Sequence, residues 1–97
     1  MDRETAVTTL RCHAQELRAQ GVAALYLFGS TARGEARGDS DVDLFFEYDD
    51  PNFSLIELVR VKDRLRTILG VRADVMTRDS LHPVLRERIE ASAIRVF

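Results

Sequence analysis

Hydrophobic residues recur first at helical and then at strand spacing near the start of the chain. Residues 4–19 carry apolar side chains three or four positions apart, at Val7, Leu10, Ala14 and Leu17. This stripe predicts one amphipathic helix, and Gly21 is a residue at which such a helix would end. Residues 22–28 then form a short apolar and aromatic run, which is typical of a buried strand.

The rest of the chain continues this alternation of strands and helices. We expect a strand over residues 41–48, a turn over 49–52, a helix over 54–69, a strand over 71–76, a helix over 80–92 and a short strand over 93–97. Ser54 with Glu57 three residues later forms a capping box, and Gly70 ends that helix. The pattern predicts an α/β (α+β) fold, a small mixed β-sheet flanked by helices, in one domain over residues 1–97.

Composition and charge narrow the class of protein. A net charge of -2 argues against a general nucleic-acid binder, so nucleic acid is not expected as a direct partner. Cys12 is the only cysteine, which excludes an internal disulfide and fits a reducing compartment. The first residues lack the pattern of a signal peptide, and no apolar run approaches the roughly 20 residues that span a bilayer. We therefore expect a cytoplasmic protein without a membrane partner.

Two acids interrupt an otherwise apolar strand. Side chains alternate along a strand, so Asp41 and Asp43 share one face, about 7 Å apart along the backbone. Two unit charges 4 Å apart repel by roughly 4 kcal/mol at an effective dielectric constant of about 20. A cation relieves this repulsion, and Mg²⁺ is commonly held by one or two carboxylates together with substrate phosphates. The alternative is a strand that begins at a solvated edge.

A glycine and a serine precede the acids and suit the phosphate side of such a site. Gly29 follows the first strand, lets the backbone approach an anion closely, and opens a possible helix at Ser30 whose amides favour anions. Arg33 lies one turn further on and could reach the same anion. We expect Ser40 to brace the turn before the acids rather than to react, and count it on the phosphate side. The alternative is a plain turn with a capping serine, with Arg33 and Arg37 as solvated loop charges.

A third carboxylate, Asp74, lies within the strand predicted over residues 71–76. If that strand lies beside the strand of Asp41 and Asp43, three acids converge and can hold two metal ions. Two ions align the attacking and leaving oxygens of an in-line phosphoryl or nucleotidyl transfer. The alternative for Asp74 is a structural acid in a salt bridge.

The spacing of these residues resembles a known signature. Gly29-Ser30, ten further residues and then Asp41-Val42-Asp43 are similar to the motif of the DNA polymerase β-like nucleotidyltransferases, and in particular of the minimal nucleotidyltransferase (MNT) family. The resemblance implies the fold core of that superfamily, phosphate contacts from Gly29 and Ser30, and Mg²⁺ bound by Asp41 and Asp43. Asp74 matches the later aspartate that completes the metal and catalytic site in that family.

The resemblance also implies a function. MNT proteins resemble the antitoxins of type VII-like toxin–antitoxin pairs, in which AMP moves from ATP onto a hydroxyl, commonly a tyrosine, of a HEPN-family toxin. We therefore expect two Mg²⁺ ions, ATP as substrate, and a complex with a HEPN-family toxin, with self-association left open. Two alternatives stay open: an antitoxin that neutralises its toxin by binding alone, and nucleotidyl transfer to RNA or to a small molecule.

Overall fold

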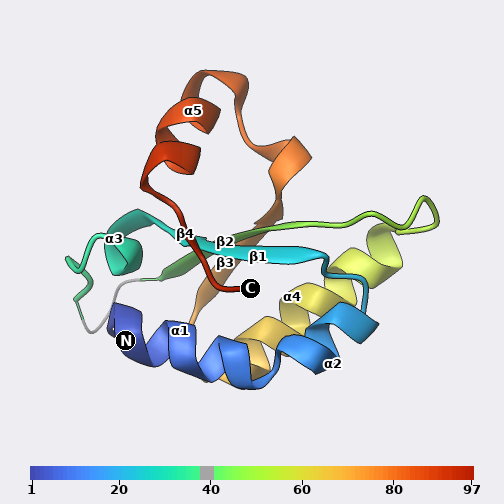
Figure 1. The fold of residues 1–97 in the computed structure, drawn as a ribbon, viewed down its shortest axis with the longest axis horizontal. Coiled ribbons are helices and arrows are strands. Elements are labelled where there is room, and N and C mark those ends of the chain that lie inside the picture. The colour runs from blue at the N-terminus through green and yellow to red at the C-terminus, as the bar shows by residue number, and fades with distance from the viewer. Residues whose placement is uncertain (38–40) are drawn as a thin grey trace.

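The computed structural model describes residues 1–37 and 41–97 (Figure 1). Its helices and strands are, in chain order, α1 (Arg3–Cys12), α2 (Ala14–Ala19), β1 (Ala24–Phe28), α3 (Gly29–Ala32), β2 (Val42–Glu47), α4 (Leu55–Leu69), β3 (Ala73–Thr77), the 3₁₀ turn η1 (Arg78–Ser80), α5 (Pro83–Ser92) and β4 (Ile94–Arg95). The predicted mixed sheet with flanking helices is confirmed.

The sheet has the strand order β3–β2–β1–β4. β1 runs antiparallel to both β2 and β4, whereas β2 and β3 run parallel. A parallel pair needs a crossover connection, and α4 supplies it between β2 and β3. This order leaves β3 at one edge of the described sheet, a position that matters for access to the site below.

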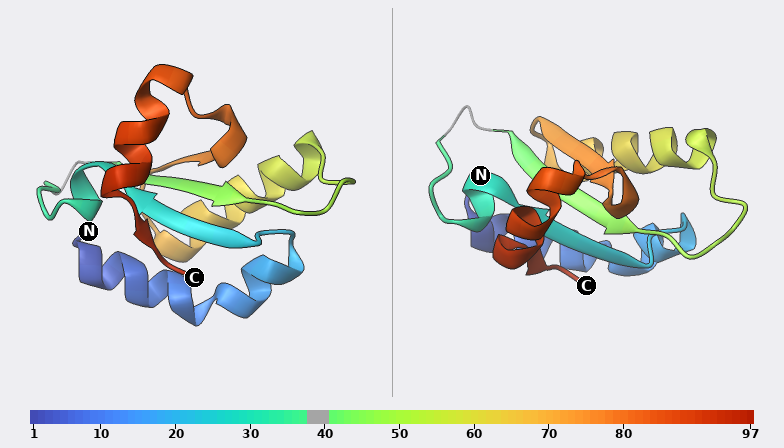
Figure 2. Two further views of the ribbon diagram at one scale, coloured as in Figure 1. Left: turned by 45° about the horizontal axis from the view of Figure 1, so that its top comes forward. Right: turned by 90° about the horizontal axis from the view of Figure 1, so that it is seen from above.

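The two faces of the sheet are covered unequally. α1, α2 and α4 pack on one face, whereas α5 and η1 lie on the other (Figures 1 and 2). Alternate residues of β2, Val42, Leu44 and Phe46, join the larger core on the three-helix face. Phe45 points the other way, packs with Phe28 and Leu81, and stacks on Tyr26 with ring centroids 4.7 Å apart. Asp43 lies two residues before Phe45 in β2, so its side chain points to the same face of the sheet. This is the less covered face, on which α5 lies.

The prediction of one helix over residues 4–19 is wrong. The chain forms two helices because the backbone leaves helical geometry at His13, with φ −108° and ψ 12°. The His13 ring nitrogen Nδ1 lies 2.9 Å from the carbonyl oxygen of Thr9, which stabilises the break. Leu10 in α1 and Leu17 in α2 are both fully buried, so the predicted apolar stripe survives the change of direction.

Most other differences concern where elements begin. β2 starts at Val42 rather than at Asp41, and β3 starts at Ala73 rather than at residue 71. The last strand is limited to β4, although the amide of Val96 still donates to the carbonyl of Leu25 at 2.8 Å. None of the helices formed by the described residues is long and apolar enough to span a bilayer.

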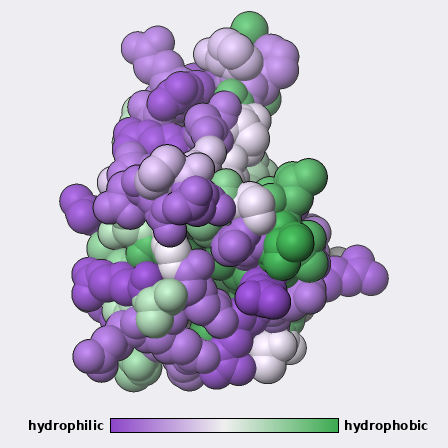
Figure 3. Space-filling model, turned by 90° about the vertical axis from the view of Figure 1, so that its right-hand side faces the viewer, coloured by the Kyte–Doolittle hydropathy of each residue, from purple (hydrophilic) through white to green (hydrophobic). Residues whose placement is uncertain are grey.

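The capping box of α4 is confirmed, and the same helix exposes a hydrophobic surface. Ser54 accepts from the amide of Ile56, and Glu57 accepts from the amide of Ser54 at 2.9 Å. Near this end, Leu55, Ile56 and Val59 are 77%, 65% and 55% exposed. These three residues are called the α4 apolar patch below, and a hydrophobic area is visible on that side of the molecule (Figure 3).

Candidate active site

The strand register brings the predicted phosphate and metal residues to one end of the sheet. Asp43 of β2 is paired with Phe28 of β1 on one side and with Asp74 of β3 on the other. Gly29 follows Phe28 directly and begins α3. Because neighbouring strands are about 4.8 Å apart, Gly29, Asp43 and Asp74 span a row of about 10 Å. The predicted neighbourhood of the Asp43 and Asp74 strands is therefore confirmed.

The Asp43 carboxylate lies in the space where a side chain at position 29 would be. Gly29 has φ +74°, and a Cβ atom built on it would overlap with Oδ2 of Asp43. Only glycine accepts both this backbone conformation and this close approach at low cost. The carboxylate consequently lies directly against the backbone of the strand-to-helix turn.

The environment of Asp43 disfavours its negative charge. Partial burial raises the pKa of the Asp43 carboxyl, and the nearby charges of Asp74 and Asp41 raise this pKa further. The positive charge of Arg33 acts in the opposite direction. The chain thus gathers carboxylates that repel one another, which is the electrostatic setting that a bound divalent cation relieves.

The donor set suits Mg²⁺, but the three acids do not form a closed cluster. Asp41 and Asp74 are exposed and line one cavity of about 740 Å³, next to the half-buried Asp43. Among residues 1–37 and 41–97, no three acid, histidine or cysteine side chains lie close enough together to ligate one ion. The structure therefore brings the acids into electrostatic contact without the full convergence predicted for Asp41, Asp43 and Asp74.

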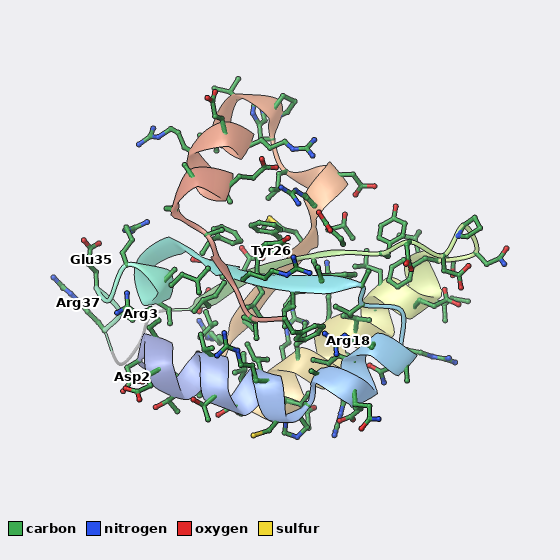
Figure 4. All side chains as sticks on the ribbon, in the orientation of Figure 1. Asp2, Arg3, Arg18, Tyr26, Glu35 and Arg37 are labelled. Atoms are coloured by element: carbon green, nitrogen blue, oxygen red, sulfur yellow. The ribbon has the colours of Figure 1, made fainter. Side chains whose placement is uncertain are left out.

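The phosphate side is formed by the single turn of α3. Its first amides, at Gly29 and Ser30, have no partners within the helix, as at any helix start. Arg3 of α1 lies near α3 (Figure 4) and donates from Nη1 to the carbonyl of Ala32 at 3.3 Å, which fixes the far end of the turn. Ser40, expected on this side, lies outside the described residues.

Arg33 lies beside Gly29 as predicted, although part of its charge is engaged. Its Nε forms a solvent-exposed ion pair with Glu35 at 3.0 Å. Arg33 and Gly29 line a cavity of about 450 Å³ together with residues of α5, including Arg88 and Ser92. Arg88 and Ser92 were not predicted, since nothing in their local sequence indicates that α5 folds back against α3.

The position of α5 depends on Arg78. This guanidinium forms ion pairs with Glu47 at the end of β2 and with Glu90 of α5, at 3.1 Å for the latter, and these bonds raise its pKa. It also lies 5.4 Å from the centre of the Tyr26 ring. Arg78 therefore links the sheet to the helix that completes the cavity beside Gly29.

Known proteins are similar to this chain in sequence and in fold. The nucleotidyltransferase domain family matches residues 10–96. A candidate protein adenylyltransferase of Methanocaldococcus jannaschii is 42% identical over 77 residues, which make up 79% of this chain and 82% of that protein. A solved structure of a candidate minimal nucleotidyltransferase is 38% identical, has a TM-score of 0.75, and matches over 97% of this chain and 95% of its own.

More distant structures share the fold. A toxin–antitoxin structure with AMP-PNP is 21% identical, with a TM-score of 0.72 over 90% of this chain and 72% of the other. A complex of tri-AMPylated Shewanella oneidensis HEPN toxin with an MNT antitoxin is 19% identical, with a TM-score of 0.63 over 90% of this chain and 68% of the other. Together with the sequence matches, these structures confirm the resemblance indicated by the Gly29-Ser30 and Asp41–Asp43 motif.

Substitution of Gly29 by alanine tests the contact with Asp43, and Gly34 provides a matched control. Both glycines have positive φ, +74° and +73°, but a Cβ on Gly34 would meet nothing within 4 Å. We expect Gly34→Ala to lose only about 1–2 kcal/mol of stability, the backbone cost of a positive φ in a residue other than glycine. Gly29→Ala should lose more stability and should also weaken Mg²⁺–nucleotide binding, measured by thermal unfolding and calorimetry. Equal effects of the two variants would contradict the contact.

Substitution of Asp43 by asparagine tests the electrostatic cost of the site. A raised folded-state pKa means that the folded protein binds the proton more readily than the unfolded chain, so stability falls as pH rises through that pKa. In the absence of metal, Asp43→Asn should raise the melting temperature at pH 7 and have a smaller effect near pH 4. Asp49→Asn, at the opposite end of β2, should change little at either pH. Loss of stability in Asp43→Asn at pH 7 would refute this account.

Proposed function

Because the chain belongs to the nucleotidyltransferase domain family, we propose that it is a Mg²⁺-dependent protein adenylyltransferase that acts as the antitoxin of a HEPN-family toxin. It transfers AMP from ATP to a hydroxyl of that toxin, and a tyrosine is the expected acceptor. The contact between Gly29 and Asp43 carries the proposal, since it joins a phosphate-binding turn to a metal-binding carboxylate. Two similar proteins support a protein as the acceptor of AMP. One relative is a candidate protein adenylyltransferase, and a structure with the same fold contains an AMPylated toxin with its antitoxin.

Different residues of the site have different roles in the transfer. The amides of Gly29 and Ser30, with Arg33, bind the phosphates that leave as pyrophosphate. The acceptor oxygen bonds to the α-phosphorus as the bond from that phosphorus to the pyrophosphate oxygen breaks. Asp74 accepts the proton of the attacking hydroxyl, because its exposed carboxylate lies on the side of Asp43 away from Gly29.

Asp41, Asp43 and Asp74 are the residues that would hold Mg²⁺. When bound, the ion polarises the α-phosphate and stabilises the charge of the departing pyrophosphate. Burial, and after it the charges of Asp74 and Asp41, raise the pKa of Asp43. The repulsion among these carboxylates supports the assignment, since a cation at the same position relieves it.

The test requires a HEPN-family reading frame beside that of this chain. Its protein product is incubated with the chain, ATP and Mg²⁺, and its intact mass is measured. We expect a gain of whole AMP units that stops on chelation and returns with added Mg²⁺. Loss of a residue that only supports the metal ligands typically slows a reaction roughly 10–100-fold. Asp41→Asn and Asp43→Asn should each slow transfer by more than this, because they change the ligands themselves. Asp49→Asn should transfer at the normal rate.

Two results would overturn the proposal. Transfer at the normal rate by both Asp41→Asn and Asp43→Asn would exclude the assigned site. Protection of cells by these variants, without any mass gain on the toxin, would favour an antitoxin that acts by binding alone.

A further inference from the structure

An in-line transfer fixes the side from which the acceptor approaches. The attacking oxygen must enter opposite the leaving pyrophosphate, which lies at Gly29 on the β1 side. The strand order places β3 and Asp74 on the opposite side of Asp43, at the edge of the described sheet. The acceptor protein therefore meets this chain at the β3 edge, where α4 ends.

The cavity at this edge carries positive charge beside the acids. Arg66, Val71 and Arg72 line it together with Asp41 and Asp74. Nε of Arg66 donates to the carbonyl of Ala73 at 3.1 Å, which holds the guanidinium next to Asp74. Within the described part of the chain, neither arginine forms an ion pair with the two catalytic acids, and the carboxylate nearest to Arg66 is that of Asp63 at 4.0 Å.

One exposed face of α4 connects this cavity to the α4 apolar patch. Its exposed residues recur three or four positions apart, at Ile56, Val59, Arg60, Asp63 and Arg66. At 1.5 Å per residue, Val59 lies about 10 Å and Ile56 about 15 Å from Arg66 along the helix. A standard interface covers about 800 Å² per partner, a circle of about 16 Å radius. An interface of this size centred near Arg66, which lines the cavity with Asp74, therefore also covers Val59 and Ile56.

Outside the α4 apolar patch, Val71 is 38% exposed and lines the cavity itself, and the remaining large exposed hydrophobic residues of the described chain lie on α5. Val84 and Leu85 of α5 are 76% and 47% exposed. They belong to the opposite face of the sheet from α4 (Figure 2). Among the large exposed hydrophobic residues on the described helices, only those of the α4 apolar patch share a helix face with Arg66, which lines the acceptor cavity.

We propose that the exposed face of α4, from the α4 apolar patch to Arg66 and including Arg72, is the docking surface for the acceptor protein. The acceptor places apolar side chains on the patch and acidic side chains at Arg66 and Arg72. The continuity of this face with the cavity of Asp74 selects the acceptor as the occupant. The three arginines of the face, Arg60, Arg66 and Arg72, outnumber Asp63 although the chain as a whole has a net charge of -2, so an acidic partner surface complements it. The inference rests on the proposed function, since it concerns the partner of the same site.

The test measures binding separately from transfer. The probe is the same HEPN-family protein as in the mass measurement, titrated by calorimetry into the Asp43→Asn background, where no transfer consumes the complex. Ile56→Ser with Val59→Ser should weaken binding at least about 10-fold, as expected for loss of two apolar anchors. Arg66→Ala with Arg72→Ala should weaken binding and reduce its dependence on salt.

Val84→Ser is the control, because it removes from α5 a side chain that is 76% exposed and does not line the cavity beside Gly29. This variant should bind the partner with unchanged affinity, and neither it nor the α4 pair should change the melting temperature of the Asp43→Asn parent. Unchanged partner affinity in the α4 pair, or an equal loss in Val84→Ser, would overturn the docking surface. A homodimer would also overturn it. In that case the chain alone sediments as a dimer, only the α4 pair dissociates this dimer, and the α4 pair still binds the partner with the parent's affinity.

The outcomes separate this inference from the proposed function. If the partner binds the unmodified chain but gains no AMP from it, the proposed function is wrong. The docking surface is still tested in that case, because the affinities of the variants are measured without transfer. Absence of any binding between the unmodified chain and the partner would defeat the docking surface directly.

Discussion

The close approach of Asp43 to Gly29 is the constraint on which the rest of the site depends. The carboxylate oxygen occupies the space that any other side chain at position 29 would need. The contact fixes the distance between a turn whose amides favour anions and the carboxylates that favour a divalent cation. A nucleotide triphosphate bound with Mg²⁺ presents both kinds of group side by side. One steric fact therefore explains why the glycine and the acid are needed together.

The unequal covering of the sheet makes this site accessible. Three helices bury one face, so the core does not depend on the face that carries Asp43. On the α5 face, the smaller aromatic cluster around Phe45 and the ion pairs of Arg78 hold α5 over part of the sheet. The ends of β2 and β3 are left open there. The protein thus keeps charged, mutually repelling groups at the border of its core, where water and an ion can reach them.

The sequence was informative wherever a local pattern determines the structure. The capping box at Ser54, the glycine at the end of α4 and the strand character of β1 and β2 all follow from short motifs. The pairing of Asp43 with Asp74 was predicted only on condition that their strands are neighbours, which the parallel register confirms. The break at His13 was missed because both halves of the helix keep the same apolar spacing. The approach of Arg88 and Arg66 to the site depends on how α5 and α4 fold back, which no local pattern encodes.

The most direct measurement is an NMR titration of the labelled chain with Mg²⁺ and a non-hydrolysable ATP analogue, repeated with Mn²⁺ as a paramagnetic probe. The account predicts shifts of the Gly29 and Ser30 amides on nucleotide binding, and Mn²⁺ broadening of the Asp43 and Asp74 amides in the same complex. Both effects should disappear in Asp43→Asn. Nucleotide shifts at Gly29 and Ser30 that persist unchanged in Asp43→Asn, or Mn²⁺ broadening elsewhere in the chain, would contradict a single site that joins phosphate and metal.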